Sequence, residues 1–271
     1  MKTTRRDFIK TAVTAAAAGA FWPGRLRAED AAVGENGAFT FLAANDLHFT
    51  EEKLCAPWFE RAFKAMRASA PQAEFLIVSG DLTSEATTPE FGGLKEAFQS
   101  FGLPVYVVAG NHDVGHDGNR KEYDAHFPDR HHYAFEHRGW QFFGFNSAPN
   151  RGAEGTIIRP SALKWMDETL PRFNPDKPSV VFTHFPLAYG LRRRPVDADG
   201  VFKRFASFNV QAILNGHFHG YTEGIWRNSR ITTNRCFSRY RDNMDGHGPK
   251  GWFVCEAREG RIHRRAVDLP E

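Results

Sequence analysis

Short apolar runs alternate with amphipathic segments along most of the chain. Three apolar runs, at residues 38–46, 74–81 and 104–111, have the composition of buried strands, and each ends in polar residues. Segments with helical spacing separate them, near residues 56–69 and 89–101, and helix-stopping residues follow each segment. This order of strand, helix and strand predicts βαβ units and a largely parallel sheet.

The alternation continues to residue 217 and then changes. The next expected strands are 140–147, 179–185 and 210–217, with helices near 160–170 and 201–208. After Gly224 the expected strands have no helical spacing between them, which predicts an antiparallel meander; they are 230–235, 251–257 and 261–269. Because no repeat or linker divides residues 38–271, we expect a single domain over that range.

The first thirty residues differ from the rest. Arg5 and Arg6 precede a weakly apolar, alanine-rich run to about Trp22, and a small-residue cleavage site ends at Ala28. The run is too short and too mild for a stable membrane span, which needs about 20 strongly apolar residues. Residues 1–28 resemble a twin-arginine export signal, the alternative being a frayed alanine helix. The resemblance implies transport by the twin-arginine translocase, cleavage near Ala28 and a periplasmic or otherwise exported protein.

Composition is that of an ordinary globular chain. Of the 271 residues, 41% are hydrophobic and 25% are charged, and the net charge is only +3. Lysines and arginines are scattered among carboxylates, so no nucleic-acid partner is expected. The three cysteines, Cys55, Cys236 and Cys255, match no zinc-ligand spacing. We expect buried free thiols, with a Cys236–Cys255 bridge as the alternative.

Metal-binding residue types collect at the ends of five expected strands. Seven of them are candidate ligands: Asp46, His48, Asp81, Asn111, His184, His217 and His219. In extended chain, residues two apart face the same side, so Asp46 and His48 can hold one ion together. Seven ligands exceed the needs of one ion but suit two ions that share a carboxylate. The mixed oxygen and nitrogen set favours manganese, iron or zinc over calcium.

The ordered motifs "DLH", "GD", "GNHD", "H" and "GHFH" closely resemble those of the calcineurin-like metallophosphoesterases, over about residues 39–219. The resemblance implies an α/β fold, a four-layer α/β/β/α sandwich of two stacked mixed sheets. It also implies two divalent or mixed-valence transition-metal ions. The implied ligands of the first ion are Asp46, His48 and His219; those of the second are Asn111, His184 and His217; and Asp81 bridges them.

The same resemblance implies hydrolysis of a phosphate mono- or diester by a metal-bridging hydroxide. His112, which is not needed as a ligand, is the expected general acid, and Asp113 is expected to orient its ring. Completeness of the site favours an enzyme. A non-catalytic metal-binding scaffold with the phosphoesterase fold is the alternative.

The expected substrate is a small phosphate ester, but the sequence does not choose its type. The segment "GDLTSEATT" lacks the tyrosine ligand of purple acid phosphatases, so an iron tyrosinate centre is not expected. The export signal argues against a DNA repair nuclease. Cyclic nucleotides, phospholipids and monoesters remain open. The run Arg192-Arg193-Arg194 is either solvated surface or a grip for a second anionic group, and His131 and His132 are either solvated or at the substrate.

Overall fold

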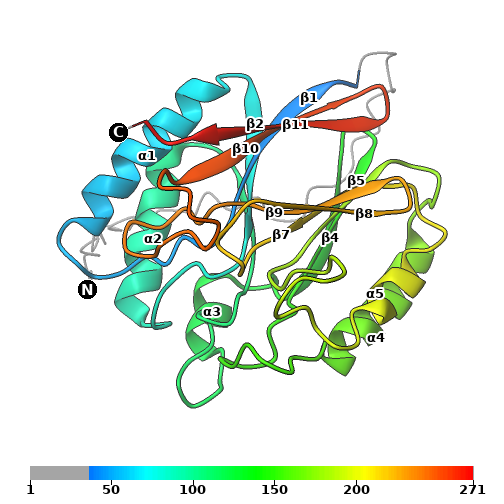
Figure 1. The fold of residues 1–271 in the computed structure, drawn as a ribbon, viewed down its shortest axis with the longest axis horizontal. Helices are drawn as coiled ribbons and strands as arrows, with labels where there is room; N and C mark the ends of the chain where they lie inside the picture. The colour runs from blue at the N-terminus through cyan, green and yellow to red at the C-terminus, as the bar shows by residue number, and fades with distance from the viewer. Residues whose placement is uncertain (1–36, 271) are drawn as a thin grey trace, which may run out of the picture.

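The computed structural model describes residues 37–270, and the expected export signal lies outside this range. Two mixed β-sheets form the centre of the protein (Figure 1). The first sheet has the order β11-β10-β1-β2-β3, in which β1, β2 and β3 are parallel. Its strands are β1 (Phe39–Ala44), β2 (Ala73–Ser79), β3 (Val105–Val108), β10 (Gly251–Arg258) and β11 (Arg261–Asp268).

The second sheet has the order β4-β5-β6-β7-β9-β8, with β5, β6, β7 and β9 parallel. Its strands are β4 (His132–His137), β5 (Trp140–Phe145), β6 (Ser179–Phe182), β7 (Val210–Asn215), β8 (Thr222–Trp226) and β9 (Ser229–Thr233). Aromatic side chains from both sheets fill the space between them. Phe41 stacks on Phe75 in the first sheet at 5.1 Å, and Phe142 of the second sheet meets Phe75 edge-on at 5.4 Å.

Helices cover the outer face of each sheet (Figure 1). On the first sheet lie α1 (Cys55–Ser69), α2 (Thr88–Phe101) and the short α3 (Lys121–His126); on the second lie α4 (Pro160–Thr169), followed by a 3₁₀ turn (Leu170–Arg172), and α5 (Asp199–Arg204). A capping box of Thr87 and Glu90 begins α2, and Gly102 ends it in the left-handed conformation. The expected four-layer sandwich of two stacked mixed sheets is confirmed.

The tail after Gly224 differs from the expected meander. Its strands divide between the sheets: β8 and β9 extend the second sheet, whereas β10 and β11 extend the first. Moreover, β9 is parallel to its neighbour β7. Alternating hydrophobicity identifies a strand but not the direction or identity of its partner, so the sequence could not provide this division. The sequence prediction also omitted α3, β4 and β8.

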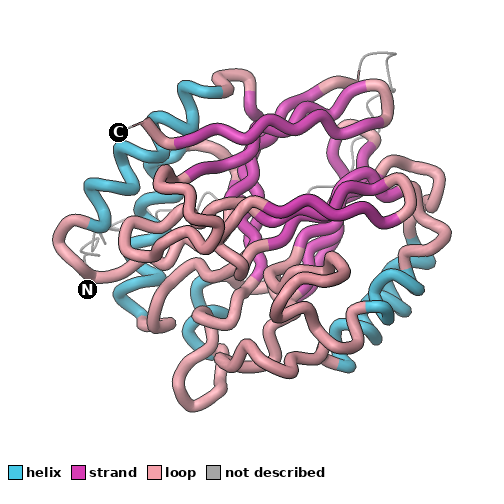
Figure 2. The backbone as a smooth tube through the Cα atoms, viewed as in Figure 1, coloured by secondary structure: helices cyan, strands magenta, loops and turns pink. Residues whose placement is uncertain are grey.

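The carboxyl ends of the parallel strands of both sheets lie at one edge of the sandwich, where long loops gather (Figure 2). Parallel strands deliver their following residues to the same edge, which is where open α/β sheets carry ligand sites. No helix in the described part of the chain is long and apolar enough to cross a bilayer.

Candidate metal centre

The seven candidate ligands follow five parallel strands, and most have unusual backbone conformations. The first ligand on each loop lies two or three residues after the end of its strand. Five ligands have positive φ values between 44° and 69°: Asp46, His48, Asp81, His217 and His219. Non-glycine residues rarely occupy this region, and such strain clusters at functional sites. The expected extended-strand arrangement is therefore corrected, because left-handed turns after the strands bring the ligands together.

The first ligand group consists of Asp46, His48, Asp81 and His219, all of which are buried. His48 Nε2 lies 3.1 Å from His219 Nε2 and 3.5 Å from Asp81 Oδ2. His219 Nε2 lies 3.2 Å from Asp46 Oδ1. Two carboxylate oxygens and two imidazole nitrogens thus meet at one point.

The second group consists of Asp81, His184 and His217, and Asn111 joins it. His184 Nε2 lies 3.0 Å from Asn111 Oδ1, 3.1 Å from His217 Nδ1 and 3.3 Å from Asp81 Oδ1. The other nitrogen of His184, Nδ1, donates to the carbonyl of Ser79 at 3.0 Å. This bond leaves Nε2 unprotonated in the neutral ring, as a metal ligand requires. Asp81 presents one oxygen to each group.

The spacing of these atoms fits transition-metal ions. Bonds of about 2.0–2.1 Å to nitrogen and oxygen place neighbouring ligand atoms roughly 3.0–3.4 Å apart in tetrahedral or octahedral geometry. The observed separations run from 3.0 to 3.5 Å. The donor set of carboxylates, imidazoles and one amide suits manganese, iron or zinc. The chain can therefore hold two ions that share Asp81.

The charges of the site favour two cations. Burial acts to raise the pKa of Asp46, but His219 lowers it to about 2, and His184 likewise depresses the pKa of Asp81 below its usual range. Burial acts to lower the pKa of His184 and His219, but Asp81 raises that of His184 to about 9 and Asp46 raises that of His219 to about 11. Each ligand group thus holds one protonated histidine, His219 in the first and His184 in the second. A metal ion that binds there would displace the proton from this histidine.

Three glycines allow the loops to approach closely. A Cβ on Gly110 would lie 2.1 Å from Asp81 Oδ1, one on Gly80 would lie 2.7 Å from His184, and one on Gly216 would lie 2.8 Å from Asp46 Oδ2. Of the three, only Gly80 has a positive φ. At Gly110 and Gly216 a glycine is needed because a side chain would not fit.

His112 borders the centre without belonging to either group. Its ring meets that of His48 edge-on, with centroids 4.8 Å apart. Its Nδ1 lies 2.8 Å from the carbonyl of Ser84 and donates to it, which leaves Nε2 for another partner. Its backbone N–H donates to Asp81 Oδ1 at 2.8 Å. The residue is half-buried, and the loop that carries it is tied to the shared carboxylate.

Asp113 does not orient the His112 ring, and that expectation is corrected: Ser84 provides the partner. The buried Asp113 carboxylate instead accepts hydrogen bonds from the backbone N–H groups of Gly110, Leu82 and Thr83, at 2.7–3.0 Å. Burial, and then the charge of Asp81, raise the pKa of Asp113 to about 7. Its position joins the two loops that carry Asp81 and Asn111, so it supports the loops themselves.

Arg151 contacts residues of the candidate site, and the sequence analysis did not identify it. Its carbonyl accepts from Asn111 Nδ2 at 3.2 Å, so that Asn111 Oδ1 faces His184. Its guanidinium donates to the carbonyl of Ser84 at 2.8 Å, the same group that holds the His112 ring. No motif marks Arg151, because it lies 40 residues from Asn111 and the contact arises only from packing.

The arginine run divides into three environments. Arg192 is exposed and pairs with Glu154 at 3.3 Å, which is a surface ion pair. Arg194 packs over the Tyr189 ring at 4.4 Å and donates to the Leu187 carbonyl. Arg193 has a positive φ of 67°, and its charge acts on His217.

Arg193 Nε is buried without an acceptor among the described residues. Its charge contributes to the lowered pKa of His217, and it forms no ion pair within the described residues.

All three cysteines are buried and free, so the expectation of free thiols is confirmed and the Cys236–Cys255 bridge is absent.

The chain belongs to the calcineurin-like phosphoesterase family, whose model matches residues 39–221. A "Probable glycerophosphodiester phosphodiesterase GpdQ" of Arcobacter nitrofigilis is 27% identical over 60% of this chain and 63% of its own length. A "Probable cyclic nucleotide phosphodiesterase" of Moraxella catarrhalis is 26% identical over 68% of this chain and 72% of its own. The chain thus spans less than two thirds of the first of these relatives.

Solved structures share the fold at lower identity. A purple acid phosphatase from yellow lupin has a TM-score of 0.64 and 11% identity, over 86% of this chain and 52% of the other. The Plasmodium inner-membrane-complex anchor GAP50 has a TM-score of 0.63 and 13% identity, over 86% and 85%. At this identity they support the fold alone.

Proposed function

We propose that the protein is a dimetal phosphoesterase. Asp46, His48 and His219 would hold one ion, Asn111, His184 and His217 would hold the other, and Asp81 would bridge them. The observation that carries this proposal is the shared carboxylate, whose Oδ2 lies 3.5 Å from His48 Nε2 and whose Oδ1 lies 3.3 Å from His184 Nε2. When bound, two such ions neutralise phosphate charge and lower the pKa of a coordinated water.

His112 is the proposed general acid. The Ser84 carbonyl holds Nδ1–H, so the protonated ring presents Nε2–H to a leaving alkoxide. Arg151 reaches the same carbonyl and limits the movement of the loop. Transfer of this proton neutralises the leaving group as its bond to phosphorus breaks, and no covalent intermediate with the protein is needed.

The proposed substrate is a phosphodiester or an ester with a second anionic group. Two of the similar proteins are named as phosphodiesterases, one for glycerophosphodiesters and one for cyclic nucleotides. Arg193 supports the same class, because a guanidinium whose charge acts on His217 can bind an anionic group beyond the scissile phosphate.

We also propose that residues 38–271 are the mature domain and that residues 1–28 direct its export by the twin-arginine route. Support comes from the Arg5-Arg6 pattern and from the family match, which begins at residue 39. Twin-arginine transport carries folded cargo, so the metal ions would be bound before export.

The test is a panel assay of the purified mature chain with manganese, iron or zinc added, on a chromogenic monoester, a chromogenic diester and glycerophosphodiesters. We expect hydrolysis that chelation abolishes and metal restores. Asp81→Asn is the matched variant, because it keeps the shape of the side chain but weakens both ligand groups. A chain with two bound ions and no activity on any ester would favour the scaffold alternative.

A further inference from the structure

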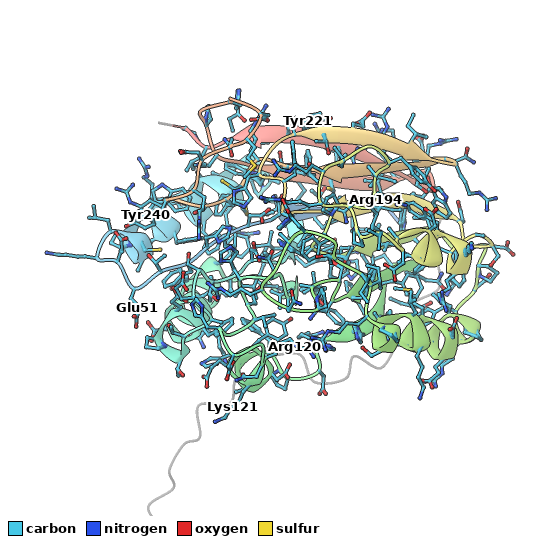
Figure 3. All side chains as sticks on the ribbon, turned by 60° about the horizontal axis from the view of Figure 1, so that its bottom comes forward. Glu51, Arg120, Lys121, Arg194, Tyr221 and Tyr240 are labelled. Carbon is cyan, nitrogen blue, oxygen red and sulfur yellow. The ribbon has the colours of Figure 1, made fainter. Side chains whose placement is uncertain are left out.

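A second group of side chains, most of them basic, lies away from the metal ligands. It is found where β4 begins and β5 ends in the second sheet. We call it the basic cluster; it consists of Arg120, His131, His132, Asn146 and Arg159. Arg120 precedes α3, His132 begins β4, Asn146 follows β5 and Arg159 precedes α4. Figure 3 shows Arg120 on the face formed by the strand-end loops.

The cluster shares the edge of the sandwich that carries the metal centre. His132 pairs with Phe145 at the carboxyl end of β5, which runs parallel to β6. Ser147 Oγ accepts from the backbone N–H of Phe185, the residue after the candidate ligand His184, at 2.8 Å. The cluster and the metal centre are therefore neighbouring but separate sites on one face.

Buried donors without acceptors define the cluster. The cluster atoms that lack a partner among the described residues are Nε and Nη1 of Arg120, Nε of Arg159, Nδ1 of His131, Nε2 of His132 and Nδ2 of Asn146. No ion pair of Arg120 or Arg159 occurs within residues 37–270. A buried donor with no acceptor costs free energy, and a buried cation with no counter-charge costs more. Something that accepts hydrogen bonds should therefore complete the cluster.

The hydrogen bonds that His132 and Asn146 make show whether their remaining side-chain atoms are donors or acceptors. His132 Nδ1 accepts from the Asn146 backbone N–H at 3.3 Å, so the proton of the neutral ring lies on Nε2, which becomes a donor. Asn146 Oδ1 accepts from Ala148 N–H at 2.7 Å, which leaves Nδ2 as the free end. Asn146 is only 2% exposed, so its amide is fixed and inaccessible to bulk water. The free atoms assigned here are therefore donors.

The charges in the cluster repel one another. Burial lowers the pKa of Arg120, and the charge of Arg159 lowers it further. Burial also lowers the pKa of His131, to about 4, with both arginines contributing. The two guanidinium groups therefore oppose each other; Asp124 acts against this effect at Arg120, but the two form no ion pair within residues 37–270. A ligand with several acceptor oxygens and a negative charge would satisfy the donors and the charges together.

We propose that the basic cluster binds a tetrahedral oxyanion of the phosphate or sulfate type. The donors exclude a metal cation as the occupant, and their number exceeds what a single carboxylate on one side can accept. This site does not depend on the phosphoesterase activity. It would exist even if the metal centre proved to be a non-catalytic scaffold.

The test is thermal unfolding of the metal-loaded protein during a sodium sulfate titration, against sodium chloride at equal ionic strength. At about ten times its Kd, a bound anion should raise the Tm by roughly 3–6 °C in a chain of this size. We expect this saturable rise in the wild type and its loss in the double variant Arg120→Gln/Arg159→Gln. Sulfate also stabilises proteins generally, but that effect does not saturate and is common to all variants.

The matched control is Arg61→Gln/Lys64→Gln, which removes the same charge from exposed positions on α1. It should keep the full saturable rise. The inhibition constant of phosphate in the enzyme assay reports the metal centre separately and should not change in either double variant. A saturable rise of equal size in the wild type and in Arg120→Gln/Arg159→Gln would overturn the proposal, as would none in the wild type.

A second variant covers the case in which the double variant does not fold. Asn146→Asp keeps the shape and the bond from Ala148, and it places a carboxylate among the free donors. We expect a higher Tm without sulfate and a smaller response to sulfate than in the wild type. An unchanged sulfate response together with a lower Tm would contradict an anion site.

Enzyme kinetics show whether the occupant of the basic cluster is a free oxyanion or an anionic group of the substrate. A KM that rises in Arg120→Gln/Arg159→Gln only for esters with a second phosphate identifies the occupant as a part of the substrate. An unchanged KM for all esters, together with the lost sulfate response, identifies it as the free ion.

Discussion

Gly110 and Asp81 lie so close that no side chain fits between them: a Cβ on Gly110 would lie 2.1 Å from Asp81 Oδ1 and 2.2 Å from its backbone nitrogen. The Gly110 N–H also donates to the Asp113 carboxylate at 2.7 Å. The same carboxylate accepts from Leu82 and Thr83 on the loop of Asp81, and so it holds the two loops together. Asp81 is the carboxylate that both ligand groups share. The absence of a side chain at Gly110 therefore sets the position of the residue on which both metal sites depend.

Gly110→Ala should disrupt both metal sites. The added methyl group would displace Asp81, so we expect loss of most of both ions by elemental analysis, and overpacking costs of about 1–3 kcal/mol in the free energy of unfolding. Gly92→Ala is the control, because a Cβ there meets nothing within 4 Å in the interior of α2. It should keep its metals and gain about 0.5–1 kcal/mol of stability. Full metal content in Gly110→Ala would show that the loops adjust without cost.

His112→Ala should separate catalysis from metal binding. We expect both ions to remain and kcat to fall by roughly 10²–10⁴ on esters with poor leaving groups, because the proposed acid is lost. Activated nitrophenyl esters, which need no proton, should lose less. His116→Ala is the control, since that ring is exposed and pairs with Glu85 at the surface. If the His112 variant lost an ion, its assignment as an acid and not a ligand would be wrong.

Arg193→Gln should weaken binding of the anionic part of the substrate. A lost charge-assisted hydrogen bond is worth about 1.5–3 kcal/mol, so KM should rise roughly 10–100-fold for an ester with a second anionic group. The kcat on small esters without such a group should stay nearly unchanged. Arg192→Gln, at the exposed pair with Glu154, should have little effect on either substrate. Equal KM values for wild type and Arg193→Gln would leave substrate choice unexplained.

His132→Asn should make the protein more tolerant of acid. Burial, and then the charges of His131 and Arg120, lower the pKa of His132 in the folded state to about 3, below about 6.5 in the unfolded chain. The unfolded chain therefore binds the proton first, so stability is complete above pH 6.5 and falls as the pH drops from there toward 3. The slope is about 1.4 kcal/mol per pH unit for one proton.

Urea unfolding of His132→Asn in sulfate-free buffer between pH 7.5 and 4 tests this slope. Asparagine at this position can still accept the bond from Asn146 N–H that His132 Nδ1 accepts, but it does not titrate. We expect a flatter pH profile than in the wild type. Parallel profiles for His132→Asn and wild type would rule out this histidine as a source of acid sensitivity.

Replacement of Arg5 and Arg6 by lysines should retain the protein in the cytoplasm. The twin-arginine route recognises that pair and transports folded cargo, so the retained protein should be folded and metal-loaded. Fractionation with metal analysis measures both properties. Equal amounts of processed protein outside the cytoplasm, with and without the arginine pair, would disprove this route.

Strand positions could be predicted because each parallel strand is a short apolar run that ends in polar residues. The carboxyl-terminal ends of β1, β2 and β7 could therefore be predicted, and so could the ligands that come directly after them. The position of β9 could not be predicted, since its parallel pairing with β7 depends on the connection through β8 and not on its own alternation. The same limit applies to the loops that orient the site.

Contacts made by packing left no pattern in the sequence. Asp113 lies next to His112 in the chain, yet its carboxylate accepts from Leu82 and Thr83 on another loop. Ser84 and Arg151 reach His112 from 28 and 39 residues away. Because motif reasoning assigns roles by sequence neighbourhood, it gave Asp113 the role that Ser84 has.

Both ligand groups take residues from both sheets. Asp46 and Asp81 follow strands of the first sheet, whereas His184, His217 and His219 follow strands of the second. Asp46 and His217 are 171 positions apart in the chain. An ion held here is a cross-link between two sheets that meet only when the sandwich has closed, and a chain with one sheet formed offers it an incomplete set of donors. Metal content therefore reports the docking of the sheets, which a measurement of secondary structure alone would not detect.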